Sequence, residues 1–232
     1  MAGRILGELV NFLVLRGFFG PNPSMLNTRW VPAAQSLSRR TLVVLHGLGD
    51  SAAGYSWLPP ALNLPWLNYL LVNAPDPYYG GFSWYEIEGD PGAGIQRSRE
   101  RLFALMDAQR DRGFPTEQTV VFGFSQGCLM AFEMGIRYPH GFAGLVGVSG
   151  YVYDVEGLLA AASPVAAQQR FLVTHGNRDP LLPLAQVQPQ IQQLQAAGLN
   201  IAWQVLDKEH TLAGETELAL IRDFIRAGYL DE

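Results

Sequence analysis

The stretch TVVFGFSQG, residues 119–127, decides the fold of this chain. Its first four residues form a short apolar run rich in β-branched side chains, which is typical of a buried strand. Apolar residues then recur at helical spacing from Gln126 to Tyr138. The Gly-x-Ser-x-Gly pattern therefore lies at a strand-to-helix turn, where a serine hydroxyl is exposed and the first helical amides lie close to it. We predict that Ser125 is a nucleophile presented by this turn.

The alternation of strand and helix continues on both sides of this turn. Short apolar runs predict further strands at residues 41–45, 69–72, 145–148, 171–174 and 201–206. Helical patterns lie between most of them, at residues 95–112, 184–197 and 215–227. Strands that alternate with helices predict an α/β fold, with a mostly parallel central sheet and helices on both faces.

Length and composition agree with one globular α/β domain. The chain has 232 residues, of which 48% are hydrophobic and 16% charged, and this excludes a disordered or long solvated coil. The net charge of −5 comes without long runs of like charge, so we expect no nucleic-acid partner. A single cysteine, Cys128, excludes an intrachain disulfide and is compatible with a reducing compartment.

Residues 1–24 are predicted to be an N-terminal extension, a helix and a linker, ahead of a single domain at residues 25–232. The apolar stretch at 5–15 is interrupted by Glu8 and Asn11 and is too short to span a bilayer. Glu8 also disfavours a signal peptide, so we expect a cytoplasmic protein. The helix is expected to pack on the domain. Alternatives are a cap over the active site, a homodimer contact or, less favoured, a membrane-surface anchor.

Chain order selects the base that would activate Ser125. In folds that present a serine nucleophile at a strand-to-helix turn, the acid and then the histidine follow it along the chain. Of the three histidines after Ser125, His140 lies in a helix-to-strand turn, and His175 ends a strand where it would fix the next loop. His210 follows the last predicted strand and comes after every credible acid. We therefore predict that His210 is the general base.

Asp179 is the predicted acid. It comes shortly after the strand at residues 171–174, and open parallel sheets place their sites at the carboxyl ends of strands. Asp154 and Asp207 are alternatives. Asp207 is only three residues from His210 and is expected to shape its loop, and Asp154 follows an earlier strand.

The developing oxyanion needs two amide donors. Gln126, directly after the nucleophile, supplies one, and the glycine-rich loop at residues 46–51 supplies the second, for which we predict the amide of Leu48. A metal site at His46 and Asp50 is the competing interpretation, but no third ligand has suitable spacing. We expect neither metal nor cofactor. Cys128, one turn into the helix, is expected to be a small buried side chain rather than a nucleophile.

A long irregular stretch at residues 74–94 is rich in Pro, Gly and aromatic residues, and loops of this length in compact domains are usually functional or disordered. We predict that the stretch helps to form an apolar acyl slot near Ser125. For each residue, ordinary loop packing is the alternative. The predicted substrate-binding residues are Trp84, Phe82, Tyr79, Leu181 and Leu182.

These motifs together resemble the acyl-protein thioesterase branch of the α/β-hydrolases, which includes small bacterial carboxylesterases and lysophospholipases. The residues that carry the resemblance are His46-Gly47-Leu48-Gly49-Asp50, Gly123-Phe124-Ser125-Gln126-Gly127, His175-Gly176-Asn177-Arg178-Asp179-Pro180 and His210, with Trp30-Val31-Pro32 and Phe82-Ser83-Trp84-Tyr85. The resemblance runs from about residue 30 to the C-terminus. It implies an α/β-hydrolase fold, a triad of Ser125, Asp179 and His210, and an oxyanion hole at Leu48 and Gln126.

The expected function is hydrolysis of carboxylic esters with short to medium acyl chains, on a small-molecule substrate. A thioesterase or lysophospholipase that removes long acyl chains from proteins or lipids is the first alternative. A hydrolase-fold binding protein without catalysis is the alternative of another class. The extension and the aromatic segment at residues 76–81 depart from the family pattern and leave the choice of substrate open.

Overall fold

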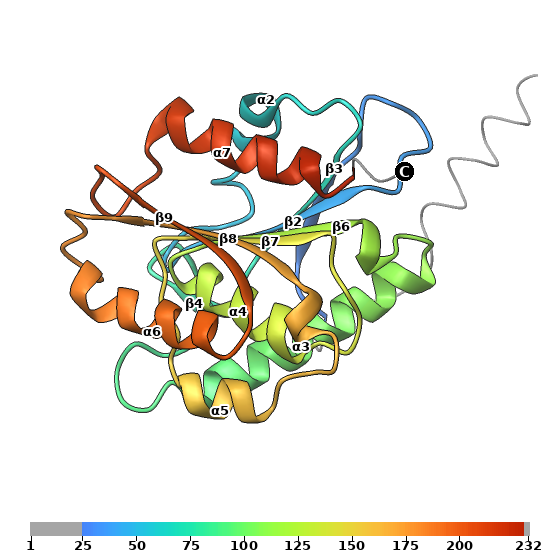
Figure 1. Ribbon diagram of the computed structural model, residues 1–232. Coiled ribbons are helices and arrows are strands. Elements are labelled where there is room, and N and C mark those ends of the chain that lie inside the picture. Colours follow the sequence, from blue (N-terminus) through green and yellow to red (C-terminus); the bar gives the residue numbers. More distant parts are fainter. Residues whose placement is uncertain (1–24, 230–232) are drawn as a thin grey trace, which may run out of the picture.

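The structure, a computed structural model, describes residues 25–229 (Figure 1). The predicted helix and linker at residues 1–24 lie outside this range, as do the last three residues. The roles predicted for the extension therefore stay predictions.

A seven-stranded sheet forms the centre of the molecule. Its order is β1 (Thr28–Val31), β3 (Asn68–Val72), β2 (Thr41–Leu45), β6 (Thr119–Phe124), β7 (Gly144–Val148), β8 (Arg170–Gly176) and β9 (Asn200–Leu206). Every neighbouring pair is parallel except β1 and β3. The predicted mostly parallel sheet is thus confirmed.

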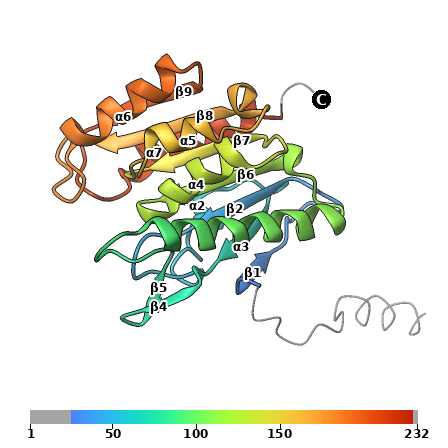
Figure 2. The same ribbon diagram turned by 90° about the horizontal axis from the view of Figure 1, so that it is seen from below.

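Helices cover both faces of this sheet, as predicted. In Figure 1, α2 (Leu58–Leu62) and α7 (Gly214–Ala227) lie above the sheet. Four helices lie below it and appear in front of the strands in Figure 2: α3 (Gly92–Asp111), α4 (Gln126–Arg137), α5 (Val155–Ala160) and α6 (Leu184–Ala196). Of the helices in residues 25–229, none is both long and apolar enough to cross a membrane.

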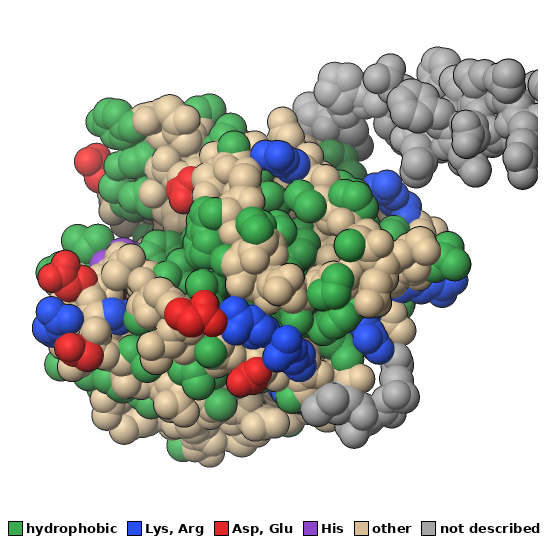
Figure 3. All heavy atoms as spheres, turned by 90° about the horizontal axis from the view of Figure 1, so that it is seen from above, with side chains coloured by type: hydrophobic (Ala, Val, Ile, Leu, Met, Phe, Trp, Pro, Cys, Tyr) green, Lys and Arg blue, Asp and Glu red, His purple; other side chains and the backbone are tan. Residues whose placement is uncertain are grey.

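The strands are apolar along both faces because each face carries its own core. In β2, Leu42 and Val44 pack into one buried cluster with α2 and α7, and Val43 and Leu45 pack into the other with α3 to α6. This alternation explains why the central strands read as continuous hydrophobic runs. The outer surface over α2 and α7 carries interspersed acidic and basic side chains (Figure 3).

Every strand and helix predicted within residues 25–229 is present, and the observed ends differ from the predicted ones by at most three residues. Several short elements were not predicted: β1, α2, α5 and a hairpin of β4 (Asp76–Tyr78) and β5 (Gly81–Ser83) within the stretch read as irregular. Strands of three or four residues are too short to show a reliable period. Because β2, β6, β8 and β9 run parallel, the loops after them meet at one edge of the sheet.

Candidate active site

Ser125 lies in a strained turn between β6 and α4. Its backbone has φ 54° and ψ −116°, a conformation that is costly for a residue with a side chain. Its amide donates to the carbonyl of Val148 at 2.9 Å, which fixes the turn against β7. A Cβ on Gly127 would lie 2.1 Å from the carbonyl oxygen of Leu45, and a Cβ on Gly123 would lie 2.0 Å from that of Gly127. The two glycines therefore allow the backbones to approach and the turn to close.

Hydrogen bonds join Ser125, His210 and Asp179 in one chain. Nε2 of His210 lies 2.9 Å from Oγ of Ser125, and Nδ1 lies 2.7 Å from Oδ2 of Asp179. An ionised Asp179 only accepts, so Nδ1 carries the proton and Nε2 is free to accept the proton of the serine hydroxyl. The structure thus brings together the three residues predicted as a triad.

The side chain of Asp179 has no exposed surface, but both of its carboxylate oxygens accept hydrogen bonds from the protein. Its Oδ1 accepts from the amides of Leu181 at 3.0 Å and Leu182 at 2.9 Å, and its Oδ2 faces His210. Burial alone would raise the pKa of Asp179, but these hydrogen bonds and the charge interaction with His210 lower it below its ordinary value. Asp179 is therefore ionised at neutral pH.

His175 lies beside the acid and supports its loop, as predicted. Its Nε2 lies 2.8 Å from the carbonyl oxygen of Leu182, to which it donates, and its ring stacks on Trp203 with centroids 5.9 Å apart. The distance from Nε2 to Oδ2 of Asp179, 3.7 Å, is too long for a hydrogen bond. Burial lowers the pKa of His175, against the effect of its bond to Leu182, and favours a neutral ring.

The alternative acids have other partners. Asp154 caps the N-terminus of α5 by accepting from the amide of Gly157 at 2.9 Å. Asp207 forms an exposed ion pair with Arg178 at 2.8 Å. His140 follows α4, with its ring centroid 5.5 Å from that of Tyr138. None of these three side chains joins the hydrogen-bond chain of Ser125.

The predicted oxyanion donors flank Ser125. The amide of Gln126 opens α4 directly after Ser125, and a Cβ on Gly47, next to Leu48, would lie 3.4 Å from Cβ of Ser125. Within residues 25–229 neither the Leu48 nor the Gln126 amide has a hydrogen-bond acceptor. Two unpaired amides beside a serine suit a substrate oxygen that becomes negative, and their role as an oxyanion hole stays a prediction.

Gln126 has a second contact that the sequence does not reveal. Its side-chain oxygen accepts from the amide of Trp84 at 3.0 Å and the hydroxyl of Ser83 at 3.2 Å, and its side-chain nitrogen donates to the carbonyl of Tyr85 at 3.0 Å. The buried side chain thereby fixes residues 83–85 against the turn of Ser125. These bonds join residues more than 40 positions apart, for which no local pattern exists.

The five predicted substrate-binding residues do not lie on one surface. Trp84 has no exposed surface, and its indole nitrogen donates to the buried carbonyl of His46 at 2.9 Å. Tyr79, at the tip of the β4–β5 hairpin, is 95% exposed. This geometry does not support a single slot built from all five. For Phe82 and Leu182, both half-buried, and Leu181, which is 69% exposed, the acyl slot stays a prediction.

His46, Asp50 and Cys128 have structural surroundings. Nε2 of His46 accepts from the amide of Ala74 at 3.0 Å, and its Nδ1 lies 2.6 Å from the carbonyl of Gly47, so both ring nitrogens are occupied. In the described part of the chain no three His, Cys, Asp or Glu side chains are grouped to hold a metal ion. Burial raises the pKa of Cys128 to about 12, so it is a thiol and a poor nucleophile.

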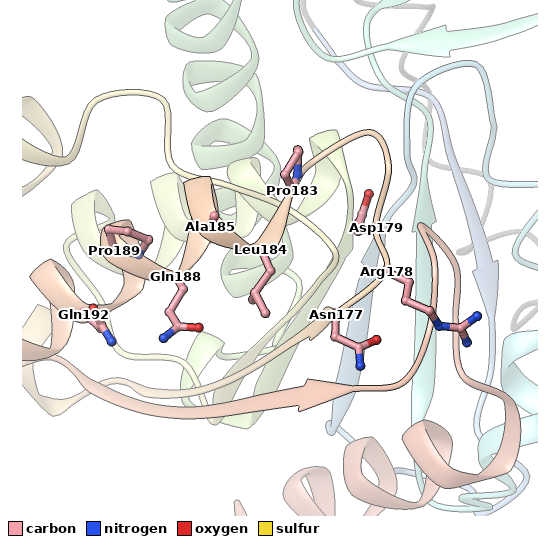
Figure 4. Close-up of a pocket in the computed structure, with 9 residues that line it drawn as sticks. All are labelled: Asn177, Arg178, Asp179, Pro183, Leu184, Ala185, Gln188, Pro189 and Gln192. Carbon is pink, nitrogen blue, oxygen red and sulfur yellow. The ribbon is translucent and has the colours of Figure 1, made fainter.

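A cavity of about 760 Å³ lies beside the loop that carries Asp179 (Figure 4). It lies between this loop and α6, and its lining residues are Asn177, Arg178, Asp179, Pro183, Leu184, Ala185, Gln188, Pro189 and Gln192. Ser125 and His210 are not among them, so we do not assign the acyl group to this cavity.

Comparisons with known proteins agree with the geometry. Residues 27–228 match the model of a family described as phospholipase/carboxylesterase. Acyl-protein thioesterase 1 of Schizosaccharomyces pombe is 31% identical over 156 residues, which cover 62% of this chain and 70% of the relative. The crystal structure of esterase PE8 has a TM-score of 0.78 at 25% identity and covers 88% of this chain and 99% of its own.

Two further solved structures show the same fold. The Bacillus cereus carboxylesterase has a TM-score of 0.76 at 17% identity, covering 88% of this chain and 95% of its own. Zea mays acyl-protein thioesterase 2 has a TM-score of 0.71 at 24% identity, covering 87% of this chain and 98% of its own. Because the family model matches nearly all of the described residues, the chain belongs to the phospholipase/carboxylesterase family of the α/β-hydrolases.

Proposed function

We propose that this protein is a serine hydrolase that cleaves carboxylic esters of short to medium acyl chains through an acyl-enzyme on Ser125. The observation that carries the proposal is the hydrogen-bond chain from Oγ of Ser125 through His210 to the buried carboxylate of Asp179. A serine hydroxyl is a weak nucleophile at neutral pH, and a histidine in this position removes its proton during attack.

The reaction has two halves. In the first, Nε2 of His210 takes the proton of Ser125 as Oγ attacks the carbonyl carbon, and the Leu48 and Gln126 amides stabilise the oxyanion. His210 then gives the proton to the leaving alcohol. In the second half, water attacks the acyl-enzyme with the same proton transfers and releases the acid. Asp179 holds the His210 tautomer and stabilises its positive charge throughout.

A thioesterase or lysophospholipase acting on long acyl chains is the second candidate, and a specific finding favours it. The matching relatives from Schizosaccharomyces pombe and Yarrowia lipolytica, at 31% and 30% identity, are named acyl-protein thioesterase 1. The same triad chemistry serves a thiol leaving group. The two candidates differ in the acyl chain that the surroundings of Phe82, Leu181 and Leu182 accept.

Replacement of Ser125 by alanine tests the reaction. By analogy with other triads, kcat for a p-nitrophenyl ester is expected to fall about a millionfold, and the fold should remain because the methyl group fits where the hydroxyl was. Circular dichroism and the thermal midpoint serve as the folding control. Retention of most of the hydrolytic activity by Ser125→Ala would reject the serine mechanism.

A panel of esters and thioesters with acyl chains of about two to sixteen carbons separates the two candidates, because each methylene buried in an apolar site contributes about 0.8 kcal/mol to binding. The first candidate predicts that kcat/KM is highest for short to medium oxygen esters. A maximum at long chains, or a preference for thioesters, favours the second. Failure of an organophosphonate to label Ser125 would favour a non-catalytic binding protein.

A further inference from the structure

Lys208 is the only lysine in the chain, and it is buried two residues before His210. Its Nζ lies 2.6 Å from Oε1 of Glu217, and the two side chains are 2% and 0% exposed. A buried charge is costly to desolvate and persists in a fold only with a close partner. The mechanism proposed above gives this ion pair no role, so its position needs a separate explanation.

Glu217, in the first turns of α7, holds more than the lysine. Its Oε1 also accepts from the hydroxyl of Thr174 at 2.5 Å, and its Oε2 accepts from the amide of Ala213 at 2.6 Å. Lys208 and Ala213 stand on either side of His210, and Thr174 lies on β8, the strand that leads to Asp179. One buried carboxylate therefore joins both ends of the His210 loop to the strand of the acid.

The loop that carries His210 has few supports of its own. Between the end of β9 at Leu206 and the start of α7, it contains no helix or strand. The carbonyl of Lys208 accepts from the amide of Arg178 at 3.1 Å, and the amide of Thr211 donates to Glu209 at 2.9 Å. The hydrogen bonds of the His210 ring are those to Ser125 and Asp179, so its position depends on how the loop is held.

We infer that Lys208 and Glu217 are positioning residues that hold the His210 loop so that Nε2 stays within hydrogen-bond reach of Ser125. This inference rests on the proposed function. The inference adds to the proposed function an ion pair, Lys208 and Glu217, that touches neither the substrate nor the reacting atoms. α7 lies on one face of the sheet and α4, which begins after Ser125, on the other (Figure 1). The pair thus fixes the base from the face opposite to the nucleophile's helix.

Removal of one partner of the Lys208–Glu217 ion pair should lower kcat more than removal of both. Burial lowers the pKa of Lys208, and the carboxylate of Glu217 opposes that shift. In Glu217→Gln the ammonium loses its partner, and in Lys208→Met the carboxylate loses its own, so each single variant leaves an uncompensated buried charge. The double variant Lys208→Met/Glu217→Gln is neutral but has lost the bond that holds the loop at position 208.

The test measures kcat and KM separately for these three variants. We expect kcat to fall about 100-fold in each single variant, with KM within about twofold, because displacing a base by about 1 Å affects the transition state more than substrate binding. The double variant should recover part of kcat and remain about tenfold below the original protein. The downfield proton signal of Nδ1 in His210 should weaken in step with kcat.

Glu215→Gln is the matched control. Glu215 lies on the same turn of α7, but its carboxylate is 72% exposed and pairs with Arg222 at 3.0 Å. Its removal should leave kcat within about twofold, as expected for a surface pair. Thr174→Val keeps both charges and removes one hydrogen bond to Glu217, and it should lower kcat several-fold. This variant replaces Glu217→Gln or Lys208→Met in the test if either does not fold.

The inference is overturned if folded Glu217→Gln or the double variant keeps its kcat and the Nδ1 proton signal, even when its thermal midpoint falls. That result would leave the pair a purely structural role. Failure of the proposed function is distinguishable, because it appears as retained hydrolysis by Ser125→Ala. Loss of hydrolysis in Ser125→Ala with unchanged kcat in Glu217→Gln rejects the positioning role alone.

Discussion

Ser125, the proposed nucleophile, and His210, the proposed base, are held in different ways. Ser125 lies between a strand and a helix, and its turn is fixed by backbone contacts: the amide bond to Val148 and the close approach of Gly127 to Leu45. His210 lies on a loop without regular structure, and side-chain contacts fix it: its ring bonds to Asp179, and Lys208 of the same loop pairs with Glu217 of α7. Backbone contacts thus fix the position of Ser125, whereas polar side-chain contacts with distant segments fix that of His210.

This difference predicts whether a substitution in each region reduces stability or kcat. A substitution that displaces the backbone of the Ser125 turn must move a central strand or a helix, so it should reduce stability. A change near His210 can be absorbed by a loop, so it should reduce kcat while the fold remains. The predictions below test this contrast.

Of the variants compared here, Asp179→Asn should lower kcat the most. The amide cannot hold Nδ1 of His210 in the protonated tautomer as a carboxylate does, so kcat is expected to fall by about 10⁴-fold. The amides of Leu181 and Leu182 can still bond to the side-chain oxygen, so the thermal midpoint should change little. Steady-state kinetics and thermal unfolding measure the two quantities. A loss of kcat smaller than about tenfold would contradict the role of Asp179.

Gly127→Ala and Gly176→Ala compare the two regions directly. A Cβ on Gly127 would meet the carbonyl of Leu45 in the central strand β2 at 2.1 Å, and we expect a loss of about 3 kcal/mol or more in the free energy of unfolding. A Cβ on Gly176 would lie 2.3 Å from the carbonyl of Lys208, in the His210 loop. There we expect a smaller loss of stability and a fall in kcat of about 100-fold.

Urea unfolding and kcat of the folded fraction measure both effects. Gly141→Ala is the control, because a Cβ there meets no atom within 4 Å. If Gly176→Ala costs as much stability as Gly127→Ala and leaves kcat intact, the contrast between the two regions is wrong.

The buried ring of His175 predicts an acid-dependent loss of stability. Its pKa in the folded protein is lowered, chiefly by burial, below the value of about 6.5 in an unfolded chain. The unfolded state therefore binds a proton first as the pH falls. The stabilisation is complete above about pH 6.5 and declines below it, by up to about 1.4 kcal/mol per pH unit for one group.

His175→Gln should make the free energy of unfolding depend less on pH between about 6.5 and 5, since glutamine does not titrate. Urea unfolding at several pH values measures this slope for both proteins. Equal slopes would show that His175 does not contribute to acid sensitivity.

Asp207→Asn should have the smallest effect, although Asp207 is adjacent to Lys208. Its ion pair with Arg178 is exposed on both sides, and such pairs contribute about 0 to 1 kcal/mol. We expect kcat within about twofold and a barely shifted thermal midpoint, by the same assays. A large fall in kcat would mean that the exposed ion pair, and not the buried one, holds the loop.

The same contrast explains how much the sequence predicts. The strands and helices around Ser125 follow from local periodicity, and the acid and base follow from chain order and the ends of parallel strands. The structure places all three side chains in one hydrogen-bond chain.

Apart from the contacts among Ser125, Asp179 and His210, contacts between distant segments could not be predicted. Trp84 is an aromatic residue in a glycine-rich loop, and only the fold shows that it is buried and that its indole donates to the carbonyl of His46. The hydrogen bonds of the Gln126 side chain to residues 83–85 and the ion pair of Glu217 with Lys208 likewise join residues that no periodic pattern relates. The strands of the β4–β5 hairpin are too short for such a pattern.

The central claim is that Ser125 carries the acyl group, and intact-protein mass spectrometry with a fluorophosphonate tests it most directly. The protein should gain the mass of one phosphonyl group, with the modified peptide carrying it on Ser125, and Ser125→Ala should gain none. His210→Ala should react far more slowly, because the hydroxyl has lost its base. Labelling of Ser125→Ala at the same rate as the original protein, or a modified residue other than Ser125, would contradict the claim.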